Sequence, residues 1–317
     1  MTSLADLEAA ARDVYAAMPP TPQYAWPLLA RRTGREIWVK HENHTPIGAF
    51  KVRGGLHLLA RLAAANPPPA GIVSATRGNH GQSLAFAARR YGVRCVIVVP
   101  EGNSADKNAS MRAFGAELVE YGRDFDEARE HAAHLAEVQQ LRFVGPFMPE
   151  LVAGVGTYAL ELFRHVPAID TVYVPIGCGS GICGLIAARD ALGLATRIVG
   201  VVSTGANAYA QSFAARRVIE TASALTIADG MAVRVPVAGA LAIILSGAAG
   251  VIEVSDDEVR AAMRIYFTDT HQIAEGAGAA PLAAVLKEGD RAGQRCAVIL
   301  SGGNVDRELY ADVIGGA

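Results

Sequence analysis

The sequence predicts an α/β fold made of open, mostly parallel sheets flanked by helices. Short apolar runs alternate with helical segments at close spacing along most of the 317 residues, which is typical of βα units on a parallel sheet. Unbroken β-branched runs, such as residues 94–100, indicate strands that are buried on both faces. The pattern stops in an irregular segment at residues 143–149 and then restarts. We therefore expect two sheet-forming halves that pack as two domains with a site between them.

The first half opens with a helix at residues 4–18, which the proline-rich residues 19–22 end. A short strand at residues 36–40 precedes a polar turn, and a helix begins near Ala49 because apolar residues recur there at helical spacing. The same alternation continues through the rest of this half. We predict strands at residues 71–74, 94–100 and 117–121 and helices at residues 83–91, 106–114 and 124–140.

The second half repeats the order of helix, strand and helix. Its clearest helix start is at Ser255, which is followed three positions later by Glu258 in a capping-box pattern. Its last strand ends at Leu300, directly before Ser301. We predict helices at residues 151–165 and 237–247, a helix from the glycines near residue 181 through residue 189, and strands at residues 171–176, 197–202, 250–254 and 295–300.

Composition and charge exclude several classes of protein. Apolar residues make up 51% and charged residues 19% of the chain, which suits a well-packed globular protein. Lys plus Arg (29) nearly balance Asp plus Glu (31), so we expect no nucleic acid or membrane partner. Runs of about 18 apolar residues and a signal-peptide pattern are both missing. The four cysteines lack metal-binding spacing, which predicts reduced thiols in a cytoplasmic protein.

Residues 45–55 carry the strongest chemical signal. Pro46 and Gly48 mark a turn, and the helix that follows places Lys51 near its start, beside Phe50. The positive end of the helix dipole and partial burial would both lower the pKa of the Lys51 ammonium and free its amine as a nucleophile. An ordinary surface lysine is the alternative, and Lys51 alone does not exclude it. Further segments of the sequence decide between the two.

Residues 177–181, Gly-Cys-Gly-Ser-Gly, lie between a predicted strand and a predicted helix. Three glycines in five residues allow backbone N–H groups to point inward, and the helix N-terminus adds positive potential, so this turn can hold a phosphate. The spacing fits neither a dinucleotide-binding fingerprint nor a P-loop. A glycine turn that only packs a helix closely on a sheet is the alternative.

Residues 74–82 form a second strand-to-helix turn with polar side chains. Thr76, Asn79 and the turn amides can donate to a carboxylate or a phenolic oxygen, although capping of the next helix by Thr76 or Asn79 is the alternative. His80 alone is more typical of a structural histidine. Two further segments contribute. Ser301 presents a hydroxyl at a strand end, and residues 275–280 open a helix with small residues that allow close approach.

In this order and spacing, the segments resemble the fold type II pyridoxal-phosphate enzymes (tryptophan synthase β-like), and within them the serine/threonine dehydratase family. The resemblance covers nearly the whole chain. It implies two domains, a large cofactor-binding domain of residues 1–44 and 146–317 and a small domain of residues 45–145, with the active site in the cleft between them, and a homodimer. The matching segments are residues 49–54, 78–81, 177–181, 228–230, 275–280 and 301–304.

The resemblance also implies roles for individual residues. Lys51 would bind pyridoxal 5′-phosphate covalently and act as the catalytic base, and Phe50 would flank the cofactor ring. Asn79 would hydrogen-bond the ring hydroxyl, and Ser301 would meet the pyridine nitrogen. The phosphate would bind at Gly177, Cys178, Gly179, Ser180 and Gly181, and the amino-acid substrate at Thr76, Arg77, Gly78, Asn79 and His80.

The implied reaction is β-elimination from a 3-hydroxy amino acid of the L-threonine or L-serine type, which yields a 2-oxo acid and ammonia. A serine at the pyridine nitrogen does not stabilise a protonated ring as a carboxylate would, so the cofactor is a weaker electron sink and β-elimination is favoured. Alternatives within the fold are racemases, β-replacement enzymes and threonine synthase. A non-catalytic cofactor-binding homologue and a nucleotide-binding protein are alternatives from other classes.

Two departures from the family pattern narrow the prediction. Arg77 stands where racemase-like relatives carry a second catalytic serine, which disfavours racemisation. Arg77 can instead pair a second substrate carboxylate, which favours 3-hydroxyaspartate, with phenylserine as a further alternative. A structural arginine that points away from the site is equally consistent with the sequence. Residues 200–203 lack the glutamate of metal-dependent relatives, so we expect no metal.

Overall fold

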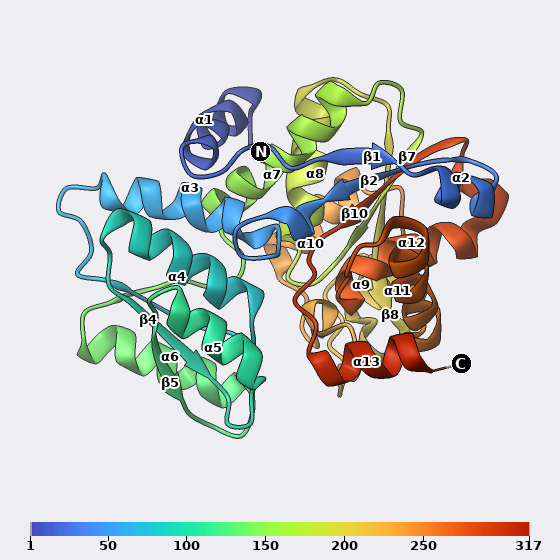
Figure 1. Ribbon diagram of the computed structural model, residues 1–317. Helices are drawn as coiled ribbons and strands as arrows, with labels where there is room; N and C mark the ends of the chain where they lie inside the picture. The colour runs from blue at the N-terminus through green and yellow to red at the C-terminus, as the bar shows by residue number, and fades with distance from the viewer. Residues whose placement is uncertain (1, 317) are drawn as a thin grey trace.

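The computed structural model describes residues 2–316 and contains two separate sheets (Figure 1). The six-stranded sheet has the order β1-β2-β10-β7-β8-β9, and the four-stranded sheet has the order β5-β4-β3-β6. The β1–β2 pair is antiparallel, and every other strand pair is parallel. The predicted α/β class with mostly parallel sheets is therefore confirmed.

The six-stranded sheet draws strands from both ends of the chain, so residues before 45 and after 170 share one sheet. Its strands are β1 (Gln23–Ala25), β2 (Glu36–His41), β7 (Thr171–Pro175), β8 (Arg197–Ser203), β9 (Gly250–Val254) and β10 (Arg295–Leu300). Helix α7 (Pro149–His165) and the helices of these two parts of the chain accompany this sheet, the latter being α1 (Leu4–Tyr15), α2 (Pro27–Thr33), α8 (Ser180–Ala191), α9 (Ala208–Ala215), α10 (Ala238–Gly247), α11 (Asp256–Thr270), α12 (Gly276–Glu288) and α13 (Arg307–Gly315). Short 3-10 turns complete them, namely η1 (Glu42–His44), η2 (Thr204–Ala206), η3 (Asp229–Met231) and η4 (Gly289–Ala292).

The four-stranded sheet is built from one continuous stretch of chain and lies at the lower left of Figure 1. Its strands are β3 (Ile72–Ala75), β4 (Cys95–Val99), β5 (Glu117–Glu120) and β6 (Arg142–Phe143), and its helices are α3 (Lys51–Ala63), α4 (Asn79–Tyr91), α5 (Ala105–Ala113) and α6 (Phe125–Val138). Each sheet together with its helices forms one layer of the molecule. Helix α3 packs against both α4 and α7, so it joins the layer of the four-stranded sheet to that of the six-stranded sheet.

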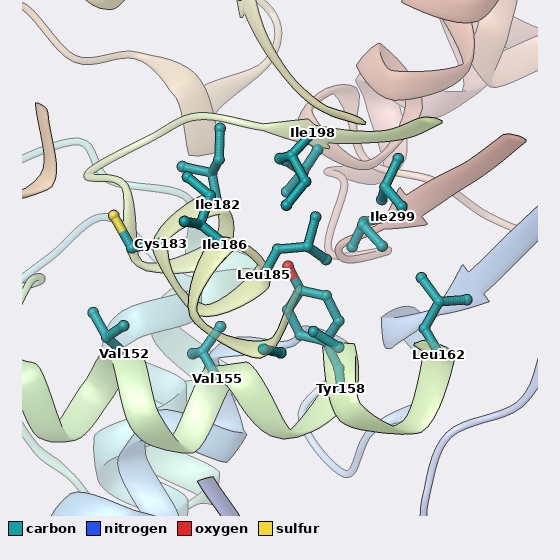
Figure 2. Packing of buried hydrophobic residues seen from close by; sticks show 14 of the residues in the cluster. Val152, Val155, Tyr158, Leu162, Ile182, Cys183, Leu185, Ile186, Ile198 and Ile299 are labelled. Carbon is teal, nitrogen blue, oxygen red and sulfur yellow. The ribbon is translucent and has the colours of Figure 1, made fainter. Parts of the chain in front are cut away.

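Both sheets bury both faces, as the unbroken apolar runs predict. In β4, Ile97 packs in one cluster with residues of α3 and α4, whereas its neighbours Val96 and Val98 pack against α6. The same division holds in the larger sheet, where one face packs on α7 and α8 and the other on α11 and α12. Figure 2 shows Val155 and Tyr158 of α7 facing Leu185 of α8 beneath the strand residue Ile198.

The structure corrects several predicted boundaries. The first helix ends at Tyr15 and not at residue 18. Helix α4 begins at Asn79 directly after Gly78, so Asn79 and His80 lie in its first turn, and not in a loop before residue 83 as predicted. Strand β6 is not predicted, because it has two exposed residues and no apolar run; only its second residue, Phe143, lies in the segment expected to be irregular. No helix or strand is predicted where the structure has β1, α2, α9 and α13.

Within residues 2–316, no helix combines the length and the apolar character needed to cross a membrane.

Candidate active site

Lys51 is the first residue of α3, and the two residues before it are joined to the segment that follows β10. The Phe50 N–H donates to the Ser301 carbonyl oxygen (2.9 Å), and Ala49 forms an isolated β-bridge with Gly302. The Lys51 Nζ lies 4.9 Å from the centre of the Phe50 ring. Burial lowers the pKa of Lys51, whereas the nearby Cys178 and Glu275 act in the opposite direction. Lys51 therefore has the environment of a reactive amine.

The turn between β7 and α8 presents backbone rather than side chains. Gly179 has a φ of 97°, which glycine adopts without strain, and a Cβ on Gly177 would overlap the Gly230 carbonyl oxygen. Helix α8 has no side-chain N-cap. In the part of the chain that the structure describes, the amide groups of residues 177–182 donate to no acceptor. This turn thus offers free N–H groups at a helix N-terminus, as an anion site requires.

Cys178, in the middle of this turn, is partly buried, and burial raises the pKa of its thiol. Tyr209 supports the turn from behind, since its hydroxyl donates to the Cys178 carbonyl oxygen (3.3 Å). The turn is therefore held in place by contacts outside itself.

The turn between β3 and α4 presents side chains. Thr76 is buried, and its Oγ1 accepts from the Gly78 N–H (3.1 Å), so it does not cap α4. Arg77 is exposed and makes no ion pair or hydrogen bond with any residue from 2 to 316. His80 is 6% exposed, and its Nε2 has no hydrogen-bond partner in the described chain. Burial, and then the charge of Lys51, lower the pKa of His80 to about 3, so the imidazole is neutral.

Asn79 is held by two residues next to the six-stranded sheet, Glu275 at the start of α12 and Asn304 after β10. Its Nδ2 donates to both carboxylate oxygens of Glu275 (2.9 and 3.1 Å), and its Oδ1 accepts from the Asn304 Nδ2 (2.7 Å). The same Asn304 group donates to the Ile47 carbonyl oxygen (2.8 Å). These contacts fix which way the Asn79 amide faces. Burial raises the pKa of Glu275, although the hydrogen bonds from Asn79 oppose this effect.

Glu275 and Asn304 are not predicted as individual site residues, and Lys107 is not predicted at all. The Lys107 Nζ on α5 forms an ion pair with Asp229 on η3 (2.7 Å) and so links the two layers. Glu275 and Asn304 do stand in motif segments, so the motifs were a usable signal for them. Lys107 has no such signal, because its partner lies far away in the sequence.

The groups that converge at Lys51 fit pyridoxal 5′-phosphate. The free amides of residues 177–182 suit its phosphate, the Lys51 amine suits its aldehyde, and the Phe50 ring offers an apolar face. Ser301 is buried, and its hydroxyl makes no hydrogen bond within residues 2–316, so it is available to the pyridine nitrogen. No group of three or more His, Cys, Asp or Glu side chains in the described chain has the geometry of a metal site.

Residues 14–302 match the family model described as pyridoxal-phosphate dependent enzyme. The chain is 32% identical over 315 residues to the L-threonine ammonia-lyase of Thermotoga maritima, covering 99% of this chain and 78% of that protein. It is 31% identical over 298 residues to the L-threo-3-hydroxyaspartate ammonia-lyase of Saccharomyces cerevisiae, covering 93% and 91%. It is 31% identical over 297 residues to the biosynthetic L-threonine dehydratase of Pasteurella multocida, where it covers 92% of this chain but only 58% of that protein.

Solved structures agree with this relationship. The crystal structure of a T.th. threonine deaminase superposes with a TM-score of 0.90 at 35% identity, covering 96% of this chain and 99% of that chain. A pyridoxal 5′-phosphate-dependent aspartate racemase superposes with a TM-score of 0.92 at 28% identity, covering 97% of both chains.

Proposed function

The chain belongs to the family of pyridoxal-phosphate dependent enzymes, and we propose that it is an ammonia-lyase that converts a 3-hydroxy amino acid of the L-threonine or L-serine type to a 2-oxo acid and ammonia. It is a lyase whose cofactor is pyridoxal 5′-phosphate. One observation carries the proposal, which is that the buried Lys51 lies close to Cys178 of the turn with free amides and directly follows Phe50, which is hydrogen-bonded to the Ser301 backbone. A hydroxyl at this position, in place of a carboxylate, favours elimination.

When bound, the cofactor withdraws electrons from the Cα of the substrate and so makes its proton acidic. Lys51 removes this proton, and the lowered pKa of its ammonium keeps the amine available as a base. The Cα–H and Cβ–O bonds break, and the β-hydroxyl leaves as water. Hydrolysis then adds one water and releases ammonia and the 2-oxo acid, so no oxidant or reductant is needed.

The remaining residues bind and orient. We propose that the amides of residues 177–181 hold the phosphate, that Ser301 meets the pyridine nitrogen, and that Asn79 meets the ring hydroxyl. The contacts of Asn79 with Glu275 and Asn304 support its role, because they hold its amide in one orientation. The substrate carboxylate would bind at the turn of Thr76, Arg77, Gly78, Asn79 and His80.

We also propose the division into a large domain of residues 1–44 and 146–317 and a small domain of residues 45–145. The membership of the two sheets supports this division, since the four strands β3 to β6 of the smaller sheet all lie within residues 45–145. A homodimer and a cytoplasmic location are proposed from the family resemblance and from the four free cysteines.

Arg77 favours a second candidate, an ammonia-lyase for 3-hydroxyaspartate. Arg77 is exposed next to the site and has no partner among the described residues, so it is free to pair a second carboxylate. The yeast relative, which is named for this substrate, supports the same candidate. Phenylserine is a further alternative. A racemase is less well supported despite the aspartate racemase neighbour, because an arginine cannot serve as the second base.

The test is release of ammonia and 2-oxo acid by the purified protein loaded with pyridoxal 5′-phosphate. The substrates are L-serine, L-threonine, threo- and erythro-3-hydroxyaspartate and phenylserine. Turnover of L-threonine or L-serine supports the first candidate, and a preference for a hydroxyaspartate supports the second. If no member of the panel reacts while the visible absorbance band of the bound cofactor is intact, the proposed reaction is wrong and a non-catalytic homologue is supported.

A further inference from the structure

The first turn of α3 is tied to the six-stranded sheet on both sides of Lys51. Before Lys51, the Phe50 N–H and Ala49 bind to the residues that follow β10. Two residues after Lys51, the side chain of Arg53 is completely buried. All partners of its guanidinium lie on segments that precede α3 or on α7.

The five N–H groups of the Arg53 guanidinium make six hydrogen-bond contacts, so one Nη2 N–H is shared between two acceptors. Its Nε and Nη2 donate to the two carboxylate oxygens of Glu42 (2.7 and 2.9 Å), and its Nη1 and Nη2 donate to those of Glu161 (2.6 and 2.9 Å). The other two go to Thr157 Oγ1 (3.0 Å) and Thr21 Oγ1 (3.1 Å). Arg53 therefore binds two carboxylates, each through two hydrogen bonds, which is the most directional arrangement available to an arginine.

A second cation completes this buried network. The Lys40 Nζ donates to Glu161 Oε2 (2.5 Å) and to the Thr21 carbonyl oxygen (2.8 Å), so two cations face two carboxylates. Buried ion pairs contribute little net stability, because the cost of removing the charges from water offsets their attraction, but they do restrict geometry. We therefore expect Arg53 to act on the position of Lys51 more than on the stability of the fold.

The backbone of Lys51 also contacts the other layer. The Ser83 hydroxyl on α4 donates to the Lys51 carbonyl oxygen (2.6 Å), and α3 packs along α4. Lys51 is thus held between the layer of the four-stranded sheet and that of the six-stranded sheet. The Gly177–Gly181 turn and Ser301, with which Lys51 must align, both belong to the latter.

We propose that Arg53 is a positioning residue, which fixes the first turn of α3 to the layer of the six-stranded sheet through Glu42 and Glu161 and so keeps the Lys51 amine aligned with the Gly177–Gly181 turn and Ser301. The inference rests on the proposed role of Lys51 as the residue that binds the cofactor covalently. It does not depend on which amino acid is the substrate.

The test compares Arg53→Lys with Lys40→Met in the full chain loaded with pyridoxal 5′-phosphate. A lysine at position 53 keeps the charge but cannot bind both carboxylates in pairs. Lys40→Met removes the other cation of the network without removing any donor or acceptor of the Arg53 hydrogen bonds, although Lys40 and Arg53 share Glu161 Oε2. The readouts are the fraction of cofactor trapped on Lys51 by borohydride, measured by peptide mass spectrometry, together with kcat, KM and the thermal midpoint.

We expect Arg53→Lys to lower the trapped fraction and to reduce kcat about 100-fold with KM almost unchanged, because a displacement of about 1 Å at a reacting group has an effect of this size. Lys40→Met should lower the thermal midpoint while keeping the trapped fraction and kcat of the wild type. The inference is overturned if Arg53→Lys affects only the thermal midpoint, or if Lys40→Met shows the same losses. The trapped fraction needs no substrate, so this test decides even if the substrate panel shows no reaction.

If Arg53→Lys does not fold, Glu42→Gln provides the second variant. The amide keeps the shape of Glu42 but loses the charge-assisted pair, and Glu161 still binds Arg53. We then expect the same pattern with a smaller loss of about tenfold in kcat, as is typical when one charged hydrogen-bond partner is neutralised. An unchanged trapped fraction and kcat in Glu42→Gln would overturn the inference.

Discussion

Two strand-to-helix turns meet at Lys51, and they are built in opposite ways. The turn between β7 and α8 offers backbone amides and is held by contacts that a Cβ would disturb. The turn between β3 and α4 offers side chains, one of them the exposed Arg77. A backbone site cannot be retuned by side-chain substitution, which suits the unchanging phosphate of a cofactor. A side-chain site can vary, which suits the substrate.

The largest loss of turnover is expected from substitution of Lys51, the residue at which both turns meet. Lys51→Ala removes the proposed nucleophile and base, so turnover should fall by at least about 10⁴-fold. The amides of residues 177–181 remain, so the variant should still bind the cofactor without a covalent link, as equilibrium dialysis and borohydride trapping would show. The exposed Lys287→Ala serves as the control and should keep full activity. Turnover by Lys51→Ala would refute the mechanism.

The second prediction compares one glycine from each turn. A Cβ at Gly177 would overlap the backbone oxygen of Gly230, which cannot move aside, so Gly177→Ala should weaken cofactor binding by about tenfold or more, in line with about 1–3 kcal/mol for overpacking. A Cβ at Gly78 meets the flexible Lys107 side chain at 3.0 Å, and the φ of Gly78 is extended. Gly78→Ala should therefore change the cofactor Kd by less than about threefold. If a cofactor titration gave the same increase in Kd for Gly177→Ala and Gly78→Ala, the proposed difference between the two turns would be contradicted.

The third prediction concerns acid. His80 in the β3–α4 turn has a pKa of about 3 in the folded protein because it is buried, whereas a histidine in the unfolded chain titrates near 6.5. Between these values the unfolded state binds more protons, so the free energy of unfolding falls as the pH is lowered, by about 1.4 kcal/mol per pH unit for this group.

His80→Asn should remove this part of the pH dependence. Urea unfolding from about pH 7.5 to about pH 4.5 would show the variant gaining stability relative to the wild type as the pH falls. The exposed His134→Asn is the control and should follow the wild type. Parallel curves for wild type and His80→Asn would show that His80 is not neutral in the folded protein. His41, which is also buried with a pKa of about 3, contributes a similar slope to all three proteins.

The difference between the two turns also explains what the sequence could predict. Buried parallel strands such as β4 and β7 are unbroken apolar runs, so they are visible in one sequence. The glycine-rich turn is visible for a similar reason, since its chemistry lies in the backbone and in local residue types. The short β6 and helix α9 carry little local signal, since β6 is two exposed residues and α9 has no side-chain cap. Helix α2 does carry one, because Pro27 stands at its start and Gly34 directly after its end, and this signal was overlooked.

Contacts between the two layers could not be predicted from the sequence. The hydrogen bond of Asn79 with Glu275 and the ion pair of Lys107 with Asp229 join segments that are brought together only by the packing of the two sheets. The first turn of α4 was misplaced for a related reason. Without a side-chain cap, the sequence carries no signal that the helix begins at Asn79.

The smallest and most selective effect is expected at Arg77. If Arg77 pairs a second carboxylate, Arg77→Gln should raise the KM for 3-hydroxyaspartate by about tenfold or more, the usual size for a lost charge-assisted hydrogen bond, and leave that for L-threonine almost unchanged. The absorbance of the bound cofactor should not change, because Arg77 forms no hydrogen bond or ion pair with the groups around Lys51 in the described chain. Steady-state kinetics with both substrates decide the matter. An equal change in KM for 3-hydroxyaspartate and L-threonine would show that Arg77 acts on the turn as a whole. Arg77 would then no longer support the contrast between a fixed cofactor turn and a variable substrate turn.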